Sequence, residues 1–457
     1  ILGLKVKMVV DAGAYPGMGA MVSNIVEGMI PGPYKISALS FESTAVVTNK
    51  ATYVAYRGPW AAETFARERV IDLIARELGK DPVEIRLRNV VNRDDQPKMV
   101  TGRSLAGVTA RESLERAAEL IDLPAFRARQ EAARAEGRYL GFGVATYIEA
   151  APGTRSDAPL GAEHMRMELA RDGTVVVYTG QMPHGQSHET TLVQVAADNF
   201  GVDFEDVRVV YGDSAIVPPG MTGGSRAATM AGGAALTTAR ALRAKVLDAA
   251  AYLLEASPSD LRIERGAVSV VGVPASAITL AEVVSAVGEP GRLPEGVDSE
   301  LIVENVYDGG AGGWSGGTHC AIVEVDIETG LVRFDRYLVV EDCGELINPA
   351  IVDGQVRGGV AQGIGAVLLE RSAYDADGNY LSSTFMDYLM PTTMEIPHIE
   401  IEHLETVPLD PDVNFRGVGE GGMIVAPPTV CNAIEDALAQ FGVRIHEQHL
   451  PPARILE

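Results

Sequence analysis

Four segments far apart in the chain place polar side chains among glycines, which let a backbone approach a ligand closely. Amides, hydroxyls and imidazoles in such loops can bind anions where a helix begins. Four loops of this kind could together hold a large anionic cofactor with several rings. Their candidate residues are Gly185, Gln186, Ser187 and His188 in the first segment, Ser225 and Arg226 in the second, Gln355 in the third and Glu420 in the fourth.

Each loop taken alone is more simply a turn, and its polar residues are more simply caps or surface groups. The chain has no G-x-x-x-x-G-K-[ST] phosphate loop. It also has no G-x-G-x-x-G motif that follows a strand, opens a helix and has an acidic residue downstream. The sequence therefore gives little support to nucleoside triphosphates or NAD as ligands.

The elements that must position these loops mix strands and helices without a regular βαβ alternation, so we predict an α+β fold. Because 457 residues exceed one ordinary core, we expect two domains, residues 1–137 and 138–457. Strand-like runs alternate with glycine and proline over residues 1–56, and Asp172-Gly173 and Glu328-Thr329-Gly330 predict hairpin turns. Apolar periodicity and capping signals predict helices over residues 60–78, 82–88, 189–199, 234–255, 353–370 and 427–440, the last beginning at Pro427-Pro428.

The charge balance argues against some partners. The chain has 38 Lys and Arg against 62 Asp and Glu, a formal charge of −24. Such acidity repels phosphate backbones and anionic lipid, so we expect neither nucleic acid nor a membrane surface as a partner. The three cysteines form no C-x-x-C pair, which fits a cytoplasmic location and argues against iron–sulfur ligation by this chain. The chain does not begin with Met and opens inside a strand-like run, so we expect a fragment or a processed piece.

Four blocks carry a resemblance that covers nearly the whole chain. These blocks resemble segments of one protein family and occur in the same order. Along the chain they are VAYRGPWAAETFARERV, TGQMPHGQSHETTLVQVAADNFGV, VVEDCGELINPAIVDGQVRGGVAQG and FRGVGEGGMIVAPPTV. That family is the molybdopterin-binding large subunits of molybdenum hydroxylases, the xanthine dehydrogenase and aerobic carbon monoxide dehydrogenase superfamily. The resemblance implies a two-domain α+β subunit whose N-terminal part, with a G-G-x-F-G segment, precedes this chain.

The resemblance implies a role for each candidate residue. Glu420 matches the catalytic glutamate, a general base that activates the oxygen nucleophile. Arg57 matches an arginine beside the molybdenum that orients substrate or stabilises developing charge, although a structural ion pair with a nearby carboxylate, such as Glu63, would explain it equally well. Gln186 and Gln355 match glutamines that hydrogen-bond the pterin. The dinucleotide site would be lined by Gly185, Ser187, His188, Ser225 and Arg226. The pterin dithiolene would hold molybdenum, so no side chain is expected as a metal ligand.

The implied activity is oxidation of an aldehyde, purine or N-heterocycle with water as the oxygen source. The cofactor would be molybdopterin cytosine dinucleotide with molybdenum. Electrons would pass to a [2Fe–2S] small subunit and a FAD medium subunit in a dimer of heteromers, and the missing N-terminal half would come from another chain or segment. No cysteine accompanies Arg57 to hold copper(I), which argues against carbon monoxide oxidation. Trp60 could wall a substrate funnel or fill the core. The alternative is a non-catalytic structural subunit that binds no molybdenum.

Overall fold

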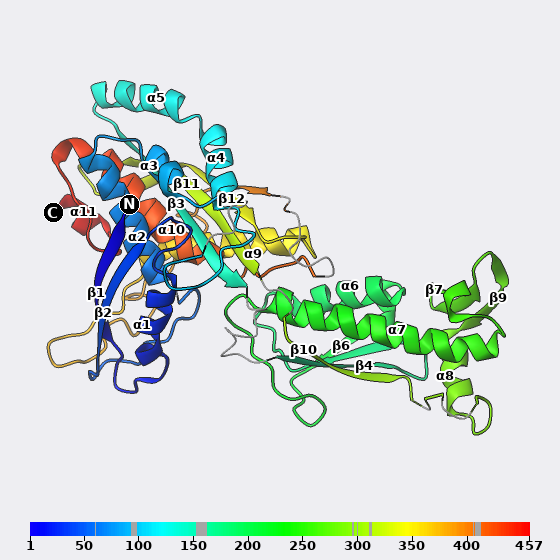
Figure 1. The fold of residues 1–457 in the computed structure, drawn as a ribbon. Helices are drawn as coiled ribbons and strands as arrows, with labels where there is room; N and C mark the ends of the chain where they lie inside the picture. Colours follow the sequence, from blue (N-terminus) through cyan, green and yellow to red (C-terminus); the bar gives the residue numbers. More distant parts are fainter. Residues whose placement is uncertain are drawn as a thin grey trace.

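The computed structural model describes residues 1–59, 61–92, 98–151, 162–294, 297–298, 300–309, 313–404, 406 and 413–457. Trp60, considered above as a funnel wall, lies outside the described residues. The elements form two groups, one containing both chain termini and the other built from the middle of the chain (Figure 1). Among the described helices, none combines the length and apolarity that crossing a bilayer requires.

A four-stranded sheet is the centre of the first group. Its order is β13-β12-β11-β3, antiparallel except for the parallel β12–β13 pair. One face packs on helices α9 and α10, and the other on α4 and α5, so both faces are apolar and buried. The bounds are β3 Tyr139–Ala151, β11 Gly313–Val325, β12 Val332–Asp342, β13 Ile399–His403, α4 Ala110–Ile121, α5 Leu123–Ala135, α9 Pro349–Leu368 and α10 Gly421–Ala437.

The N-terminal elements pack beside this sheet. Strands β1 (Gly3–Asp11) and β2 (Ala38–Val46) pair in parallel, joined through helix α1 (Gly17–Met29). Helices α2 (Ala61–Glu77) and α3 (Pro82–Asn89) follow, and both strands and both helices agree with the prediction. Helix α1 was not predicted, because its three glycines weaken the helical signal.

The second group is inserted between β3 and β11, which nevertheless pair directly. Its sheet has the order β10-β4-β5-β6 and packs on helices α6 and α7 around one apolar core. The β4–β5 pair confirms the hairpin predicted at Asp172-Gly173. The bounds are β4 Glu163–Leu169, β5 Val175–Thr179, α6 His188–Phe200, β6 Val207–Tyr211, α7 Gly233–Leu253, β7 Leu261–Glu264, β8 Ala267–Val270, β9 Val273–Thr279, α8 Leu280–Gly288 and β10 Ile302–Tyr307.

The last long helix differs from its prediction. Helix α10 begins at Gly421, so Pro427 and Pro428 lie inside it rather than at its start. All but one of its residues are buried, and packing against β3, α9 and α2 outweighs the local cost of two prolines. The earlier start makes Glu420 the residue that precedes the helix. The predicted division between residues 137 and 138 coincides with the turn from α5 to β3 and stays a prediction.

Glycines let β3 and α10 touch through their backbones. A Cβ atom at Gly143 would lie 2.0 Å from the Thr429 carbonyl oxygen, and one at Gly141 would lie 2.0 Å from that of Ala433. Farther along, a Cβ at Gly421 would lie 2.0 Å from the Tyr147 hydroxyl oxygen. The strand and the helix therefore run side by side at a separation that larger residues would prevent.

Replacing Gly143 with Ala should lower the free energy of unfolding by about 1–3 kcal/mol, because the new methyl group has no space against α10. Urea unfolding of the purified complex would measure this loss. Gly354→Ala in α9 is the matched control. No atom lies within 4 Å of the added methyl there, so stability should be unchanged or rise by up to about 1 kcal/mol. Equal stability of the two variants would contradict the backbone contact.

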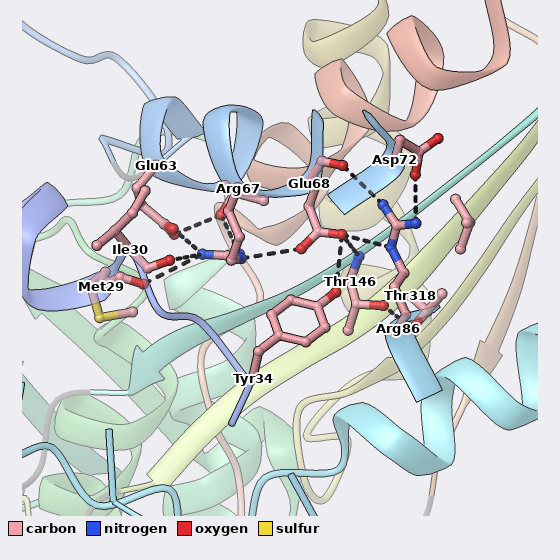
Figure 2. A network of polar contacts seen from close by, with 12 residues as sticks. Met29, Ile30, Tyr34, Glu63, Arg67, Glu68, Asp72, Arg86, Thr146 and Thr318 are labelled. Carbon is pink, nitrogen blue, oxygen red and sulfur yellow. Dashed lines mark hydrogen bonds and ion pairs between the residues drawn. The ribbon is translucent and has the colours of Figure 1, made fainter. Parts of the chain in front are cut away.

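A buried network of arginines and carboxylates anchors α2 to the sheet (Figure 2). Glu68 of α2 lies at its centre and accepts from Arg67 at 3.1 Å and from Arg86 at 2.9 Å. It also accepts from the Tyr34 hydroxyl and from the backbone N–H of Thr146 in β3, both at 3.1 Å. These bonds fix α2, and with it the segment that precedes it, against β3.

Replacing Glu68 with Gln should destabilise the protein by about 3–5 kcal/mol, because two buried guanidinium groups would lose a shared counter-charge. Chemical denaturation would measure the effect. The exposed pair between Arg138 and Glu324 is the control, and Glu324→Gln should cost no more than about 1 kcal/mol. A loss at Glu68 as small as at Glu324 would show that the network does not anchor the helix.

Candidate cofactor-binding and catalytic site

A cavity of about 590 Å³ is lined by loops and helix ends from both groups of elements. Its walls come from five stretches that are separated in the sequence. All the predicted site residues except Ser187 line it: Arg57, Gly185, Gln186, His188, Ser225, Arg226, Gln355 and Glu420. Ser187 adopts a left-handed backbone (φ 61°) and turns the chain into α6, where its carbonyl accepts from Thr190 and Thr191. The structure thus brings together segments that the sequence suggested only separately.

Glu420 occupies the position before the first turn of α10. Its carboxylate accepts from the backbone N–H of Gly224 at 3.3 Å, and its own N–H donates to the Ser225 hydroxyl at 3.0 Å. Burial raises the pKa of Glu420 above its usual value, while hydrogen bonds from Glu149 and from the Gly224 and Gly58 amides act in the opposite direction. A carboxylate with a raised pKa is suited to accept a proton near neutral pH.

The small residues around Glu420 have a steric cause. A Cβ atom at Gly417 would lie 1.5 Å from the Ser225 carbonyl oxygen, so the two loops meet backbone to backbone. Ser225 itself has a left-handed conformation, with φ 47°. This contact joins the loop before α10, in the first group, to the loop before α7, in the second.

Arg57 bridges the loop before α10 and helix α9. Its Nε donates to the Gly419 carbonyl, and one terminal nitrogen donates to both the backbone oxygen and the side-chain Oε1 of Gln355, at 3.1 and 3.2 Å. The other donates to Gln362 at 3.0 Å. Burial lowers the pKa of Arg57 from its very high usual value, and the nearby Glu420 and Glu149 charges oppose that change.

The alternative partner considered for Arg57, Glu63, is bound elsewhere. Glu63 forms an ion pair with Arg67, one helical turn along α2, and both side chains are about 1% exposed. The interpretation of Arg57 as a partner of Glu63 is therefore wrong. The i,i+4 spacing of Glu63 and Arg67 was visible in the sequence and signals the observed pair.

The two predicted pterin-binding glutamines are both half-buried in the cavity wall. Gln186 accepts from the backbone N–H of His184, and Gln355 accepts from Arg57. Gln362, which sequence analysis missed, lies seven residues after Gln355 and hence on the same face of α9. That spacing was the available signal for it.

His188 is a buried polar side chain that lacks a partner in the described part of the chain. It is 5% exposed and lines the cavity, and neither ring nitrogen has a hydrogen-bond partner within the described part of the chain. Burial lowers its pKa, which favours the neutral imidazole. A neutral ring both donates and accepts, so a polar ligand in the cavity would satisfy it.

Arg226, which was expected to line the dinucleotide site, binds other residues of the protein. Its guanidinium is 1% exposed and donates to Glu163 and to the Met221 carbonyl, at 2.8 and 2.9 Å. It therefore ties its loop to β4, while the residue also lines the cavity. Its role in cofactor binding stays a prediction. In the described residues, no cluster of three or more His, Cys, Asp or Glu is placed to hold a metal ion.

Two family models, each for a molybdopterin cofactor-binding domain, match residues 1–90 and 116–397. The nicotine 6-hydroxylase large subunit of Paenarthrobacter nicotinovorans is 38% identical, and the match covers the whole of this chain. The chain belongs to the molybdenum hydroxylase large-subunit family. The carbon monoxide dehydrogenase large chain of Hydrogenophaga pseudoflava is 32% identical over 97% of this chain. The predicted family is thereby confirmed.

Solved molybdenum hydroxylase structures share the fold. Quinoline 2-oxidoreductase from Pseudomonas putida 86 matches with a TM-score of 0.92 and 40% identity, over 99% of this chain and 59% of that one. A Cu,Mo-carbon monoxide dehydrogenase matches with a TM-score of 0.89 and 27% identity, over 100% of this chain and 59% of that one. These matches confirm the predicted α+β molybdopterin-binding fold. This chain spans about 57% of the length of the two relatives named above, as expected for part of a longer subunit.

Replacing Arg57 with Lys should loosen the loop that precedes α10, because a lysine cannot reproduce the fork that joins Gly419 to Gln355. Losing hydrogen bonds to a charged group costs about 1.5–3 kcal/mol, so amide exchange over residues 417–420 should rise by about tenfold or more. Hydrogen–deuterium exchange with mass spectrometry would measure it. Arg357→Lys, at an exposed ion pair on α9, is the control and should leave exchange there unchanged. Unaltered protection in the Arg57 variant would refute the bridge.

Proposed function

We propose that this chain is the catalytic, cofactor-binding part of a molybdenum hydroxylase that oxidises its substrate with water as the oxygen source. One observation carries the proposal: the partly buried Glu420 carboxylate lies in the same cavity wall as Arg57, Gln186, Gln355 and the neutral His188. A surface-loop carboxylate, the simpler interpretation of Glu420 from sequence, would be solvated and remote from these loops.

The cavity suits the proposed cofactor, molybdopterin cytosine dinucleotide. Its volume of about 590 Å³ falls within the 300–1,000 Å³ typical of ligand sites. Gly223, Gly224 and Gly419 have no side chains, so a ligand can approach the backbone of the cavity wall closely at these positions. The His188 ring, which has no partner within the described residues, supplies a buried donor and acceptor. The cofactor, when bound, would supply the oxygen-transfer and two-electron redox chemistry.

The chain's own residues would prepare the reaction. Glu420 would accept a proton through a carboxylate whose pKa burial raises, held by the Gly224 and Gly58 amides. Arg57, fixed by four hydrogen bonds, would present a permanent positive charge where negative charge develops. Both side chains are partly buried, which would limit their contact with bulk water and strengthen these interactions.

An N-heterocycle is the favoured substrate among the aldehydes, purines and N-heterocycles considered. The names of two relatives, nicotine 6-hydroxylase and quinoline 2-oxidoreductase, refer to compounds of this class. Carbon monoxide is disfavoured, since no cysteine lies beside Arg57. Cys343 does line the cavity, but burial raises the pKa of its thiol well above the usual range, and a protonated thiol is a poor copper ligand.

The proposed partners follow from what this chain lacks. Its described cysteines are all free and buried, so electrons would leave through a [2Fe–2S] small subunit and a FAD medium subunit. A further segment or chain would complete the molybdopterin-binding subunit, and the whole would assemble as a dimer of heteromers. Free thiols fit the proposed cytoplasmic location.

Replacing Glu420 with Gln should leave stoichiometric molybdenum and cytosine dinucleotide in the purified complex but lower kcat by about 10²–10⁴-fold. Metal analysis, nucleotide extraction and steady-state kinetics with an N-heterocycle would test this. In the wild type, kcat should rise with pH as Glu420 ionises, at a higher pH than for an ordinary glutamate. Glu304→Gln, on the exposed edge strand β10, is the control and should retain full turnover.

The same measurements distinguish the proposed catalytic subunit from the alternative, a non-catalytic structural subunit. A structural subunit without a catalytic role would contain no molybdenum in the wild-type complex. Full turnover in the Glu420 variant, with molybdenum bound, would remove Glu420 from the role of base.

A further inference from the structure

The alternation of side chains along β3 places Glu149, a residue of this strand, beside the start of helix α10. Gly141, Gly143 and Tyr147 share the face of β3 that touches this helix, and they meet Ala433, Thr429 and Gly421 in turn. The contacts move towards the helix N-terminus as the strand advances. Two residues beyond Tyr147, on the same face, comes Glu149, and one residue before Gly421 comes Glu420. The geometry of strand and helix therefore brings the two carboxyl groups together.

The burial of Glu149 and its electrostatic effects also indicate that it lies near Glu420 and Arg57. Glu149 is 0% exposed, and it acts to lower the pKa of Glu420, which burial raises. Arg57 lies within the electrostatic reach of both carboxyl groups. Two carboxylates in one buried place repel each other strongly, so such a pair retains one proton over a wide pH range. A hydrogen bond between them requires that proton.

We propose that Glu149 is a positioning residue that keeps one proton and donates it in a hydrogen bond to the ionised Glu420. The pair then carries a single negative charge opposite the single positive charge of Arg57. Glu149 would fix the direction of the Glu420 carboxylate without touching substrate or cofactor. The effect on turnover rests on the proposed function, whereas the shared proton does not.

The other charged and titratable groups around the pair leave this balance intact. Tyr147 of β3 and Cys343 after β12 have pKa values raised well above their usual ranges by burial, so both stay neutral. Three further groups near the pair are two charged side chains that have ion-pair partners and one neutral side chain. Arg416 is engaged by Asp342, Glu341 of β12 by His403, and His188 across the cavity is neutral at working pH.

The proposal fixes the sign of a pH effect. As pH rises, Glu149 loses its proton, the hydrogen bond is lost and two adjacent anions remain, so kcat should fall on the alkaline side. Glu149→Gln keeps a donor of similar shape that does not titrate. This variant should retain most of the wild-type kcat at neutral pH and lose the alkaline fall. Glu149→Leu removes the donor and should lower kcat by about tenfold or more with molybdenum still bound.

Infrared difference spectroscopy of the purified complex at neutral pH tests the shared proton without turnover. Subtracting the Glu149→Gln spectrum from the wild type should reveal the C=O stretch of one protonated carboxyl group. In Glu420→Gln the same band should persist but shift, because its acceptor changes from a carboxylate to an amide. Glu341→Gln, at a buried carboxyl group on β12, two strands away from β3 in the same sheet, is the control and should leave the band in place.

The outcomes separate the two proposals. Absence of the band, an unshifted band in Glu420→Gln, or an unchanged alkaline fall in Glu149→Gln would each overturn the shared proton. Full turnover in Glu420→Gln would overturn the proposed function but leave the infrared result standing.

Discussion

A carboxylate that is withdrawn from water at the end of a helix must be compensated by groups brought to it, and this requirement shapes the site around Glu420. The donors come from separate parts of the chain: the Gly58 amide before α2, the Gly224 amide before α7 and, in the proposed pair, Glu149 at the end of β3. Arg57 adds the opposing charge. Gly224 alone among these residues belongs to the second group of elements, so its amide reaches Glu420 only where the two groups meet.

Backbone contact is what makes that closure possible. Glycines at positions 141 and 143 bring β3 against α10, and Gly417 brings the loop before α10 against Ser225. Behind these contacts, the buried Glu68 network holds α2 to β3 and so fixes the end of the segment that carries Arg57 and leads into α2 (Figure 2). Side chains with catalytic chemistry are few, while the residues that place them extend through most of the first group.

Much of this architecture could be predicted from the sequence, because helices with strong apolar periodicity and hairpins with clear turn residues carry local signals. The start of α10 could not, since Pro427 and Pro428 suggest a helix start and only packing on β3 shows otherwise. The motif resemblance selected residues that line one cavity, but it did not specify their partners. Arg226 pairs with Glu163, and Glu149 faces Glu420, through strand and helix registers that the sequence does not display.

The pairing of β3 with β11 across the inserted second group has a consequence for maturation. Because the chain leaves and re-enters one sheet at adjacent strands, the inserted part and the sheet are separate bodies, and Phe415 of the first group packs into the core of the inserted part. The pocket walls exist only after both have folded and docked. Loading of a prosthetic group would thus be a late event, and the loaded ligand would act as a clamp that favours the docked form in proportion to its affinity.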